Sequence, residues 1–303
     1  MVRVQGGALA QAATRELVQP LGLETFAHNG AALNGYSGMI QDLLDRVGGG
    51  VRELGVTLGR DLCLIRKVPL ALGLNKEMAN AHLRWEAEQG LVSPLGRYVL
   101  DYQRLPVTSH AGHPVYLLVL LRKQVLQQLQ RLVKGLGLTL IDLDVDVFAL
   151  IRTLSVTAAD GGDALSVLVD IEDHRMTVIV IREGDYFLMH RVALIESGLK
   201  QKSQRPAELA SVLVKELRRL VFGHRLGGDL DALGRIVMTG EAASAEWVDA
   251  VSAQVNVPVD LLDPFSRLKV SPAVSQNPEM SRAARHYGAA VGIALKQGAI
   301  LTQ

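Results

Sequence analysis

The sequence predicts a duplicated α/β fold, in which each of two halves combines strands with covering helices. The first half opens with a strand at Val2–Gln5, a tight turn at Gly6-Gly7 and a second strand at Leu9–Leu17. The second half opens with three successive strands after a polar, glycine-bearing stretch at residues 155–163. No G-x-G-x-x-G or Walker A sequence is present, so Rossmann and P-loop architectures have no support.

Apolar spacing predicts alternating helices and strands in the rest of the first half. Glycines 48–50 end a helix that begins near Ser37, and Asn75 caps a helix that runs to Gln89. An amphipathic helix is expected over Arg122–Val133. The expected strands are Gly55–Leu58, Leu62–Ile65, Tyr98–Leu105, Val115–Leu121 and Leu138–Leu143, followed by a short helix through Arg152.

The second half begins with strands that short polar turns connect, which predicts an antiparallel meander. Pro206 starts the next helix, because the first turn of a helix does not need the N–H that proline lacks. A final helix over Met280–Lys296 is rich in Ala and Gly, which suits close backbone packing. The remaining expected elements are the strands Leu165–Val169, Met176–Ile181, Tyr186–Ile195, Gly234–Thr239 and Val257–Leu262 and the helices Pro206–Phe222 and Ala245–Val255.

Size and composition allow two folded lobes and exclude several classes of protein. The 303 residues carry 49% hydrophobic side chains, 32 basic and 31 acidic residues, so neither disorder nor a chain-wide attraction to nucleic acid is indicated. Cys63 is the single cysteine and lies among apolar residues, which favours a structural thiol. No signal peptide or membrane-spanning run is evident, so we expect a cytoplasmic protein without direct membrane insertion, linked to a membrane only through a partner.

Acidic residues occupy two turns in which a nucleotide-binding scaffold places small residues. Asp170-Ile171-Glu172-Asp173 follows one buried strand, and Gly240-Glu241 follows another. Phosphate loops work because backbone N–H groups approach the anion closely, which glycine permits and a side chain obstructs. The strand-to-loop layout therefore points to an ATP-type fold, whereas the side chains at Glu172, Asp173 and Glu241 argue against ATPase activity.

Other chemistry-bearing residues have simpler explanations. Asp142, Asp144 and Asp146 suggest a calcium loop, but the required glycine and glutamate are missing, so we expect Asp144 and Asp146 to complement the start of the next helix. His110, His113 and His174 are interpreted as exposed loop residues, because no acid or cysteine accompanies them at ligand spacing. Trp85 and Trp247 lie on helical patterns and are expected in the core.

An ordered set of segments resembles the type IV pilus assembly protein PilM family, which has an actin-like fold. The most distinctive block runs from Leu83 to Gln89 and continues through Pro94-Leu95 and Leu100–Gln103. Further similar segments follow in the family's order along nearly the whole chain. They are Gly137-Leu138, Asp144, Phe148–Arg152, Val169–Ile171, Gly184, Glu216–Arg219, Met238–Gly240, Asp263–Phe265 and Gly288–Leu295.

The resemblance implies a two-lobed actin-like duplicated α/β fold of the ribonuclease H-like (ASKHA) type. Lobe one would cover residues 1–158, with an inserted small subdomain at about 56–123. Lobe two would cover residues 159–280, and residues 281–303 would form a helix that packs back on lobe one.

The sequence departs from the family at its nucleotide loops. The first strand with its D-x-G phosphate loop is not found, the family's Asp-Ile-Gly is Asp170-Ile171-Glu172, and its Gly-Gly pair is Gly240-Glu241. Two like charges about 4 Å apart repel by roughly 4 kcal/mol at an effective dielectric of about 20. Bound magnesium would offset part of that repulsion. We therefore expect no cofactor and no catalytic residue, with binding of ATP and magnesium as the less favoured alternative.

The resemblance also implies a function. Members of the family bind the cytoplasmic N-terminal peptide of an inner-membrane protein, PilN, in a groove of lobe one beside the inserted subdomain. They couple that complex to the motor ATPase and the platform protein, and they can self-assemble. We therefore expect a cytoplasmic scaffold without nucleic-acid partners.

Two alternatives remain at this point. The first is an active actin-like ATPase, which would need a phosphate loop that the sequence does not reveal. The second is the cytoplasmic component of a type II secretion system of the GspL kind, although that family normally continues into a membrane helix.

Overall fold

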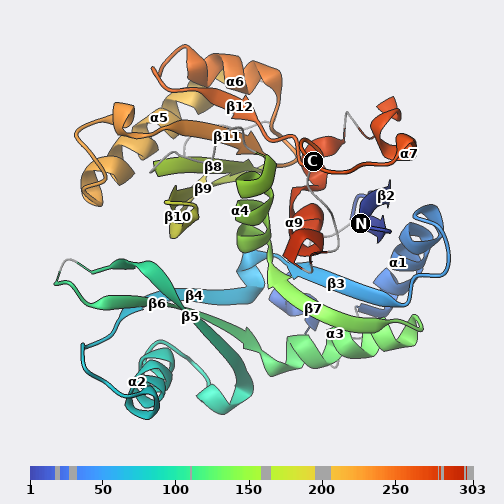
Figure 1. Cartoon of the computed structure of the whole chain (residues 1–303), viewed down its shortest axis with the longest axis horizontal. Helices are drawn as coiled ribbons and strands as arrows, with labels where there is room; N and C mark the ends of the chain where they lie inside the picture. The colour runs from blue at the N-terminus through green and yellow to red at the C-terminus, as the bar shows by residue number, and fades with distance from the viewer. Residues whose placement is uncertain are drawn as a thin grey trace. The chain divides into compact units, whose positions relative to one another are not determined.

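The computed structural model describes residues 1–17, 21–26, 33–109, 111–157, 165–194, 206–278, 280, 283–296 and 298. These residues form two compact units (Figure 1). The first unit comprises Met1–Thr14 and Phe148–Gln303, and the second comprises Arg15–Val147. The lobe boundaries expected from the sequence stay predictions.

A five-stranded sheet organises the first unit, with strand order β10-β9-β8-β11-β12. β8 (Leu165–Ile171), β9 (Arg175–Arg182) and β10 (Asp185–Ala193) form the antiparallel meander that the sequence predicts. β11 (Arg235–Thr239) runs parallel to β8 and to β12 (Val259–Leu261). The carboxyl ends of β8 and β11 therefore lie together at one edge of the sheet.

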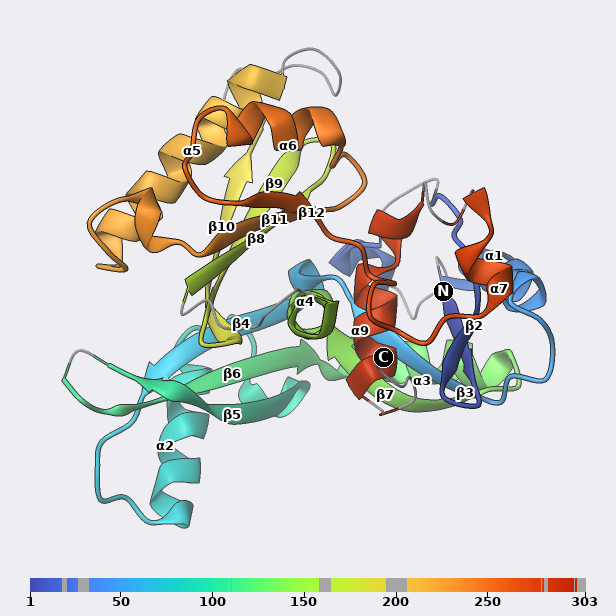
Figure 2. The same cartoon turned by 45° about the horizontal axis from the view of Figure 1, so that its top comes forward.

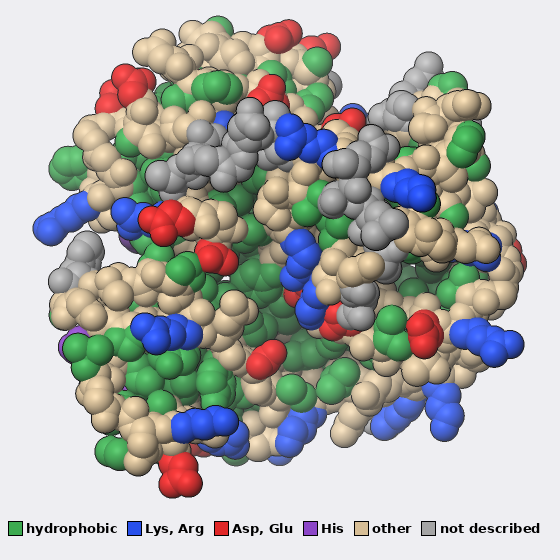
Figure 3. Space-filling view, viewed as in Figure 1, with side chains coloured by type: hydrophobic (Ala, Val, Ile, Leu, Met, Phe, Trp, Pro, Cys, Tyr) green, Lys and Arg blue, Asp and Glu red, His purple; other side chains and the backbone are tan. Residues whose placement is uncertain are grey.

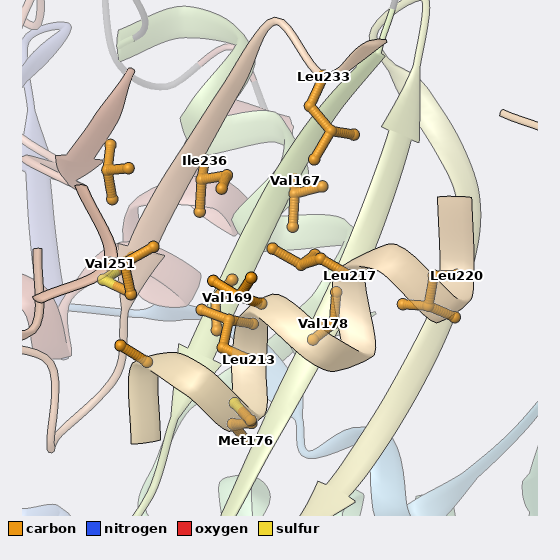
Figure 4. Close-up of a cluster of buried hydrophobic side chains, with 14 of the residues drawn as sticks. Val167, Val169, Met176, Val178, Leu213, Leu217, Leu220, Leu233, Ile236 and Val251 are labelled. Carbon is orange, nitrogen blue, oxygen red and sulfur yellow. The ribbon is translucent and has the colours of Figure 1, made fainter. Parts of the chain in front are cut away.

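Two helices, α5 (Pro206–Gly223) and α6 (Ala245–Ser252), cover one face of this sheet (Figure 2). Val167 and Val169 lie two residues apart on β8 and therefore point to the same face. That face packs against Leu213 and Leu217 of α5, as Figure 4 shows. Each fully buried side chain of this size contributes about 1.5–3 kcal/mol of transfer free energy. Trp247 of α6 joins the same cluster, as the sequence predicts.

A hairpin and the last helix form a second cluster in the first unit. β1 (Val2–Gln5) pairs with β2 (Ala8–Ala12), which is shorter than the strand expected to reach Leu17 because β1 offers only four partners. Gly6 and Gly7 both have positive φ and form the predicted turn. The hairpin packs on Tyr287 and on α9 (Gly288–Lys296), and α7 (Pro272–Ser275) lies beside β2.

The single helix expected over Met280–Lys296 is wrong. A 3-10 turn at Ala284–His286 precedes α9, and Tyr287 forms a bend between the two. This break lets the Tyr287 side chain bury completely beside the hairpin while α9 approaches α4 (Asp146–Thr157) through its glycines.

The second unit contains a parallel strand pair and a separate antiparallel sheet. β3 (Glu53–Leu58) pairs with β7 (Thr139–Val145), and α1 (Asn34–Arg46) precedes them. The core beside this pair includes α3 (Lys123–Gly135) and a 3-10 turn, η1 (Leu23–Phe26). Gly48 follows α1 with positive φ, in agreement with the predicted helix stop.

The antiparallel sheet has the order β4-β6-β5, formed by Cys63–Pro69, Pro114–Arg122 and Tyr98–Thr108. Helix α2 (Lys76–Glu88) covers one face of it. The Asn75 side chain accepts a hydrogen bond of 2.8 Å from the Met78 N–H, so the predicted cap is confirmed. The remaining short 3-10 turns are η3 (Arg60–Leu62), η4 (Leu95–Arg97) and η5 (Leu230–Ala232).

Trp85 does not lie in the core, contrary to the sequence-based expectation. It is 56% exposed on α2, where Leu83 and Ala87 instead face the sheet. Its ring meets that of His82 edge-on at 5.8 Å.

Among the described residues, no helix is both long enough and apolar enough to cross a bilayer.

Candidate functional site

The two acidic turns singled out in the sequence lie next to each other. β8 and β11 are parallel neighbours, with Asp170 opposite Thr239 in the register. The Ala242 N–H donates a hydrogen bond of 3.1 Å to the Ile171 carbonyl oxygen, which links the two segments directly. The structure therefore brings Asp170 and Ile171 against Gly240, as parallel strand ends require, and Glu172 follows directly in the chain.

The turn after β8 is a closed hairpin. The Glu172 N–H donates to the Arg175 carbonyl oxygen at 2.9 Å, so this backbone donor is already used within the turn. Asp170 is buried with 8% exposure, Asp173 is half-buried and His174 is exposed. Exposure of His174 agrees with the expectation of a solvated turn residue.

A bidentate ion pair spans this turn. Arg175 Nε donates to Glu172 Oε2 at 2.6 Å and Arg175 Nη2 donates to Glu172 Oε1 at 3.0 Å. A fork of two parallel bonds fixes both side chains as well as their charges. The repulsion between Glu172 and a bound phosphate that the sequence suggested assumed an unpaired carboxylate. In the structure, the guanidinium of Arg175 offsets the charge of Glu172. Sequence reasoning missed Arg175, although its spacing of three residues from Glu172 was visible.

The loop after β11 is held by its backbone. Gly240 has φ +99°, and a Cβ there would clash with the Ile171 carbonyl oxygen and Asp170 Oδ1. Only glycine permits this approach, so Gly240 keeps the tight contact that the family pattern requires. The neighbouring Glu241 is exposed.

Thr239 is a further polar residue of this edge that sequence reasoning missed. Its side chain is 1% exposed, and its hydroxyl has no hydrogen-bond partner among the described residues. It lies at ordinary van der Waals distance, 3.9 Å, from where a Cβ of Gly288 would be. Its position directly before Gly240 was the available signal.

Helices α4 and α9 cross closely behind this edge. A Cβ at Gly292 would overlap the Ala149 backbone, so the two helices touch through their main chains. The Thr153 hydroxyl donates to the Gly288 carbonyl oxygen at 2.7 Å, and Arg152 Nη1 donates to the Gly292 carbonyl oxygen at 2.8 Å. The predicted close backbone packing of the last helix is confirmed.

Asp146, the first residue of α4, forms a structural ion pair. Asp146 accepts a hydrogen bond of 3.0 Å from Arg60 Nε and one of 2.6 Å from the Val147 N–H. Arg60 is almost fully buried, so this ion pair joins η3 to the start of α4 in the second unit. Asp144 accepts from the Val145 N–H at 2.8 Å. The expected complement to the helix start is therefore confirmed for Asp146.

Cys63 and the loop histidines were the other candidate residues. Burial raises the pKa of the Cys63 thiol to about 12, with Asp146 and Asp144 adding to the shift, so this thiol stays protonated near neutral pH. His113 is half-buried rather than exposed, and His110 lies outside the described residues. No group of three or more metal-ligating side chains occurs within the described part of the chain.

The comparisons with known proteins decide the family. The family model of the type IV pilus assembly protein PilM matches residues 17–195, which is more than half of the chain. The chain belongs to the PilM family. No curated protein matches it.

Solved structures show the fold of this PilM-family chain. The PilM–PilN type IV pilus biogenesis complex matches 99% of the chain and 95% of its counterpart, with a TM-score of 0.75 and 20% identity. The fold class predicted from the sequence, actin-like α/β, is confirmed. The cytoplasmic domain of EpsL, an inner-membrane component of the type II secretion system of Vibrio cholerae, gives a TM-score of 0.40 at 11% identity over 70% of this chain and 68% of that one. A Bacteroides thetaiotaomicron protein with an actin-like ATPase fold gives 0.41 at 10% identity, with 79% of each chain covered. Neither of these weaker likenesses carries an argument.

Proposed function

We propose that this PilM-family chain is a cytoplasmic scaffold of a type IV pilus assembly machine that binds the N-terminal peptide of a PilN-like inner-membrane protein. The observation that carries the proposal is the match over 99% of the chain to the structure of a PilM–PilN complex. Membership of the family supports it independently. An extended peptide would gain affinity from main-chain hydrogen bonds and from pockets for alternate side chains.

Titration calorimetry with the purified protein tests this proposal. The ligand is a synthetic peptide of the cytoplasmic N-terminus of the PilN-like protein from the same organism, and a scrambled peptide is the control. Saturable binding of the native peptide alone supports the scaffold role. Absence of binding to protein with a native circular dichroism spectrum and a cooperative thermal transition would overturn it.

The nucleotide loops support a scaffold without a cofactor. We expect the turn after β8 to fit a triphosphate poorly, because the Glu172 N–H is used within the hairpin and Glu172, paired with Arg175, stands where the family's pattern has glycine. The loop after β11 retains the close approach at Gly240. The proposed scaffold has therefore kept the shape of one nucleotide loop and lost that of the other.

Equilibrium binding of a fluorescent ATP analogue with magnesium tests the lost cofactor. A known actin-like ATPase serves as the positive control, and no saturable binding up to millimolar nucleotide is the expected result. Saturable binding displaced by plain ATP would instead favour the active actin-like ATPase. The scaffold would then couple PilN to the motor ATPase and platform protein, and to further copies of itself, through nucleotide state.

A further inference from the structure

The solvent-facing side of α3 carries cations and no acids. Its sequence from Lys123 to Gly135 contains three basic residues and not one Asp or Glu. Lys123, Gln127, Gln130 and Lys134 recur at intervals of four, three and four residues, so they lie along one face of the helix. Arg131 borders this face. We call these five residues the α3 stripe, and it is about 17 Å long at 1.5 Å per residue.

Within the described part of the chain, no acidic side chain pairs with the cations of the stripe. Lys123, Arg131 and Lys134 are exposed, and none makes an ion pair with any described residue. Among the elements packed against α3, Glu24 of η1 is an exposed acid. On β7, Asp142 and Asp144 are half-buried and accept hydrogen bonds from their own neighbours. The chain-wide net charge of +1 therefore conceals a local positive surface.

Two partly exposed leucines lie in and just before the turn η1, which contacts α3. The Gln124 and Gln128 amides of α3 both donate to the Phe26 carbonyl oxygen at 2.8 Å, which fixes η1 against the helix. Leu21 and Leu23 precede that anchor and are 38% and 40% exposed. Figure 3 shows Lys and Arg side chains along the lower right edge of the molecule, where α3 runs in Figure 1.

We propose that the α3 stripe, with Leu21 and Leu23 beside it, docks on an anionic phospholipid surface. The three cations would face phosphate groups, the glutamines would donate hydrogen bonds to them, and the leucines would enter the interfacial region. Exposed basic residues near a membrane are attracted by its negative surface potential, and apolar side chains add to that attraction.

Charge and composition favour lipid over an acidic protein. Protein interfaces are depleted in lysine and enriched in aromatic residues and methionine at their centres. The stripe contains Lys, Gln and Arg and no aromatic residue. Three cations at about 1 kcal/mol each, with two leucines, give weak binding that millimolar lipid brings into a measurable range, and in the cell the stripe would orient a chain that a second attachment retains. The proposal does not depend on binding of PilN.

Flotation with lipid vesicles tests the docking. The probes are vesicles of phosphatidylglycerol with phosphatidylethanolamine, compared with vesicles of phosphatidylcholine, at millimolar lipid and at low and high salt. We expect partitioning onto the anionic vesicles only, with loss at high salt because the charges are exposed to screening. The triple variant K123E/R131E/K134E should lower the partition coefficient by roughly a hundredfold.

A matched variant separates the stripe from total charge. The control variant is K76E/R84E/K215E, which reverses three exposed cations that are not on α3. It changes the net charge by the same amount as the α3 triple variant, and it should lose only a small part of the vesicle binding. If K123E/R131E/K134E shows no cooperative melting transition, the charge-neutral variant K123Q/R131Q/K134Q is measured in its place. L23S should weaken binding several-fold without changing the salt dependence.

Three outcomes would overturn the proposal. These are no binding to anionic vesicles, equal binding to neutral vesicles, and equal loss in the two triple variants. Saturable binding of a polyglutamate peptide by a protein that ignores vesicles would assign the stripe to an acidic protein partner instead. PilN-peptide binding measured on the same variants shows whether the scaffold function survives independently.

Discussion

The turn after β8 and the loop after β11 end neighbouring parallel strands of one sheet, yet different interactions hold each of them. In the first, a bidentate ion pair between Glu172 and Arg175 adds to the backbone hydrogen bond of the hairpin. The main chain closes the second, because Gly240 lies against the Ile171 carbonyl oxygen. A side-chain contact can be changed by one substitution at small cost, whereas a main-chain contact cannot. The difference shows that two neighbouring turns at the end of one sheet can tolerate substitution to different extents.

The largest effect is expected at the main-chain contact. Gly240→Ala adds a Cβ where backbone atoms already lie and where φ is positive, so it should lower the free energy of unfolding by about 2–4 kcal/mol, the sum of strain and overpacking. Urea denaturation measures the loss. Gly184→Ala in the turn between β9 and β10 is the matched control, because its φ is +82° but no atom lies within 4 Å of its Cβ. Equal losses at the two glycines would contradict a role for the contact with β8.

Glycine at both loops should increase the affinity of the protein for nucleotide. The double variant E172G/E241G removes the ion pair and both carboxylates, and it should raise the affinity for the fluorescent ATP analogue at least about tenfold, equivalent to about 1.4 kcal/mol. The variant E183G/E246G removes two acids elsewhere on the first unit and serves as the control for net charge. Unchanged affinity in E172G/E241G would mean that these two acids are not what disfavours nucleotide.

The sequence predicted the strands that end here and the meander of the first three, because buried strands and turn residues follow local rules, but it did not predict the parallel pairing of β8 with β11. It could not predict that Arg175 would pair with Glu172, because their geometry depends on the hairpin register between β8 and β9. Nor could it predict the exposure of Trp85, since a helix of α2's composition allows more than one face to be apolar and only the position of the sheet selects Leu83 and Ala87. The break at Tyr287 has the same origin, in the packing of a distant hairpin.

The Glu172–Arg175 ion pair should contribute much less to the free energy of unfolding than the main-chain contact at Gly240. A double-mutant cycle with Glu172→Gln and Arg175→Gln should give a coupling energy of about 0.5–1 kcal/mol, because the two side chains are 26% and 32% exposed and the pair is screened by salt. Denaturation in urea at low and high salt measures it. The Arg218–Asp229 pair, with a separation of 3.7 Å and exposures of 59% and 65%, is the control and should show almost no coupling. If the coupling energy of the Glu172–Arg175 pair is as small as that of the control, the ion pair adds nothing measurable to the backbone hydrogen bond of the turn.

The smallest effect is expected at Thr239, which ends β11 opposite Asp170 of β8. Its hydroxyl is buried without a hydrogen bond among the described residues, so Thr239→Val removes an uncompensated polar group at nearly constant volume. The free energy of unfolding should stay within about 0.5 kcal/mol of the parent, on the stabilising side. Thr153→Val is the matched control, because that hydroxyl donates to the Gly288 carbonyl oxygen, and it should cost about 1 kcal/mol or more. Destabilisation by Thr239→Val comparable to that of Thr153→Val would show that the Thr239 hydroxyl has a partner in solution, such as a buried water at the junction of β11 and α9.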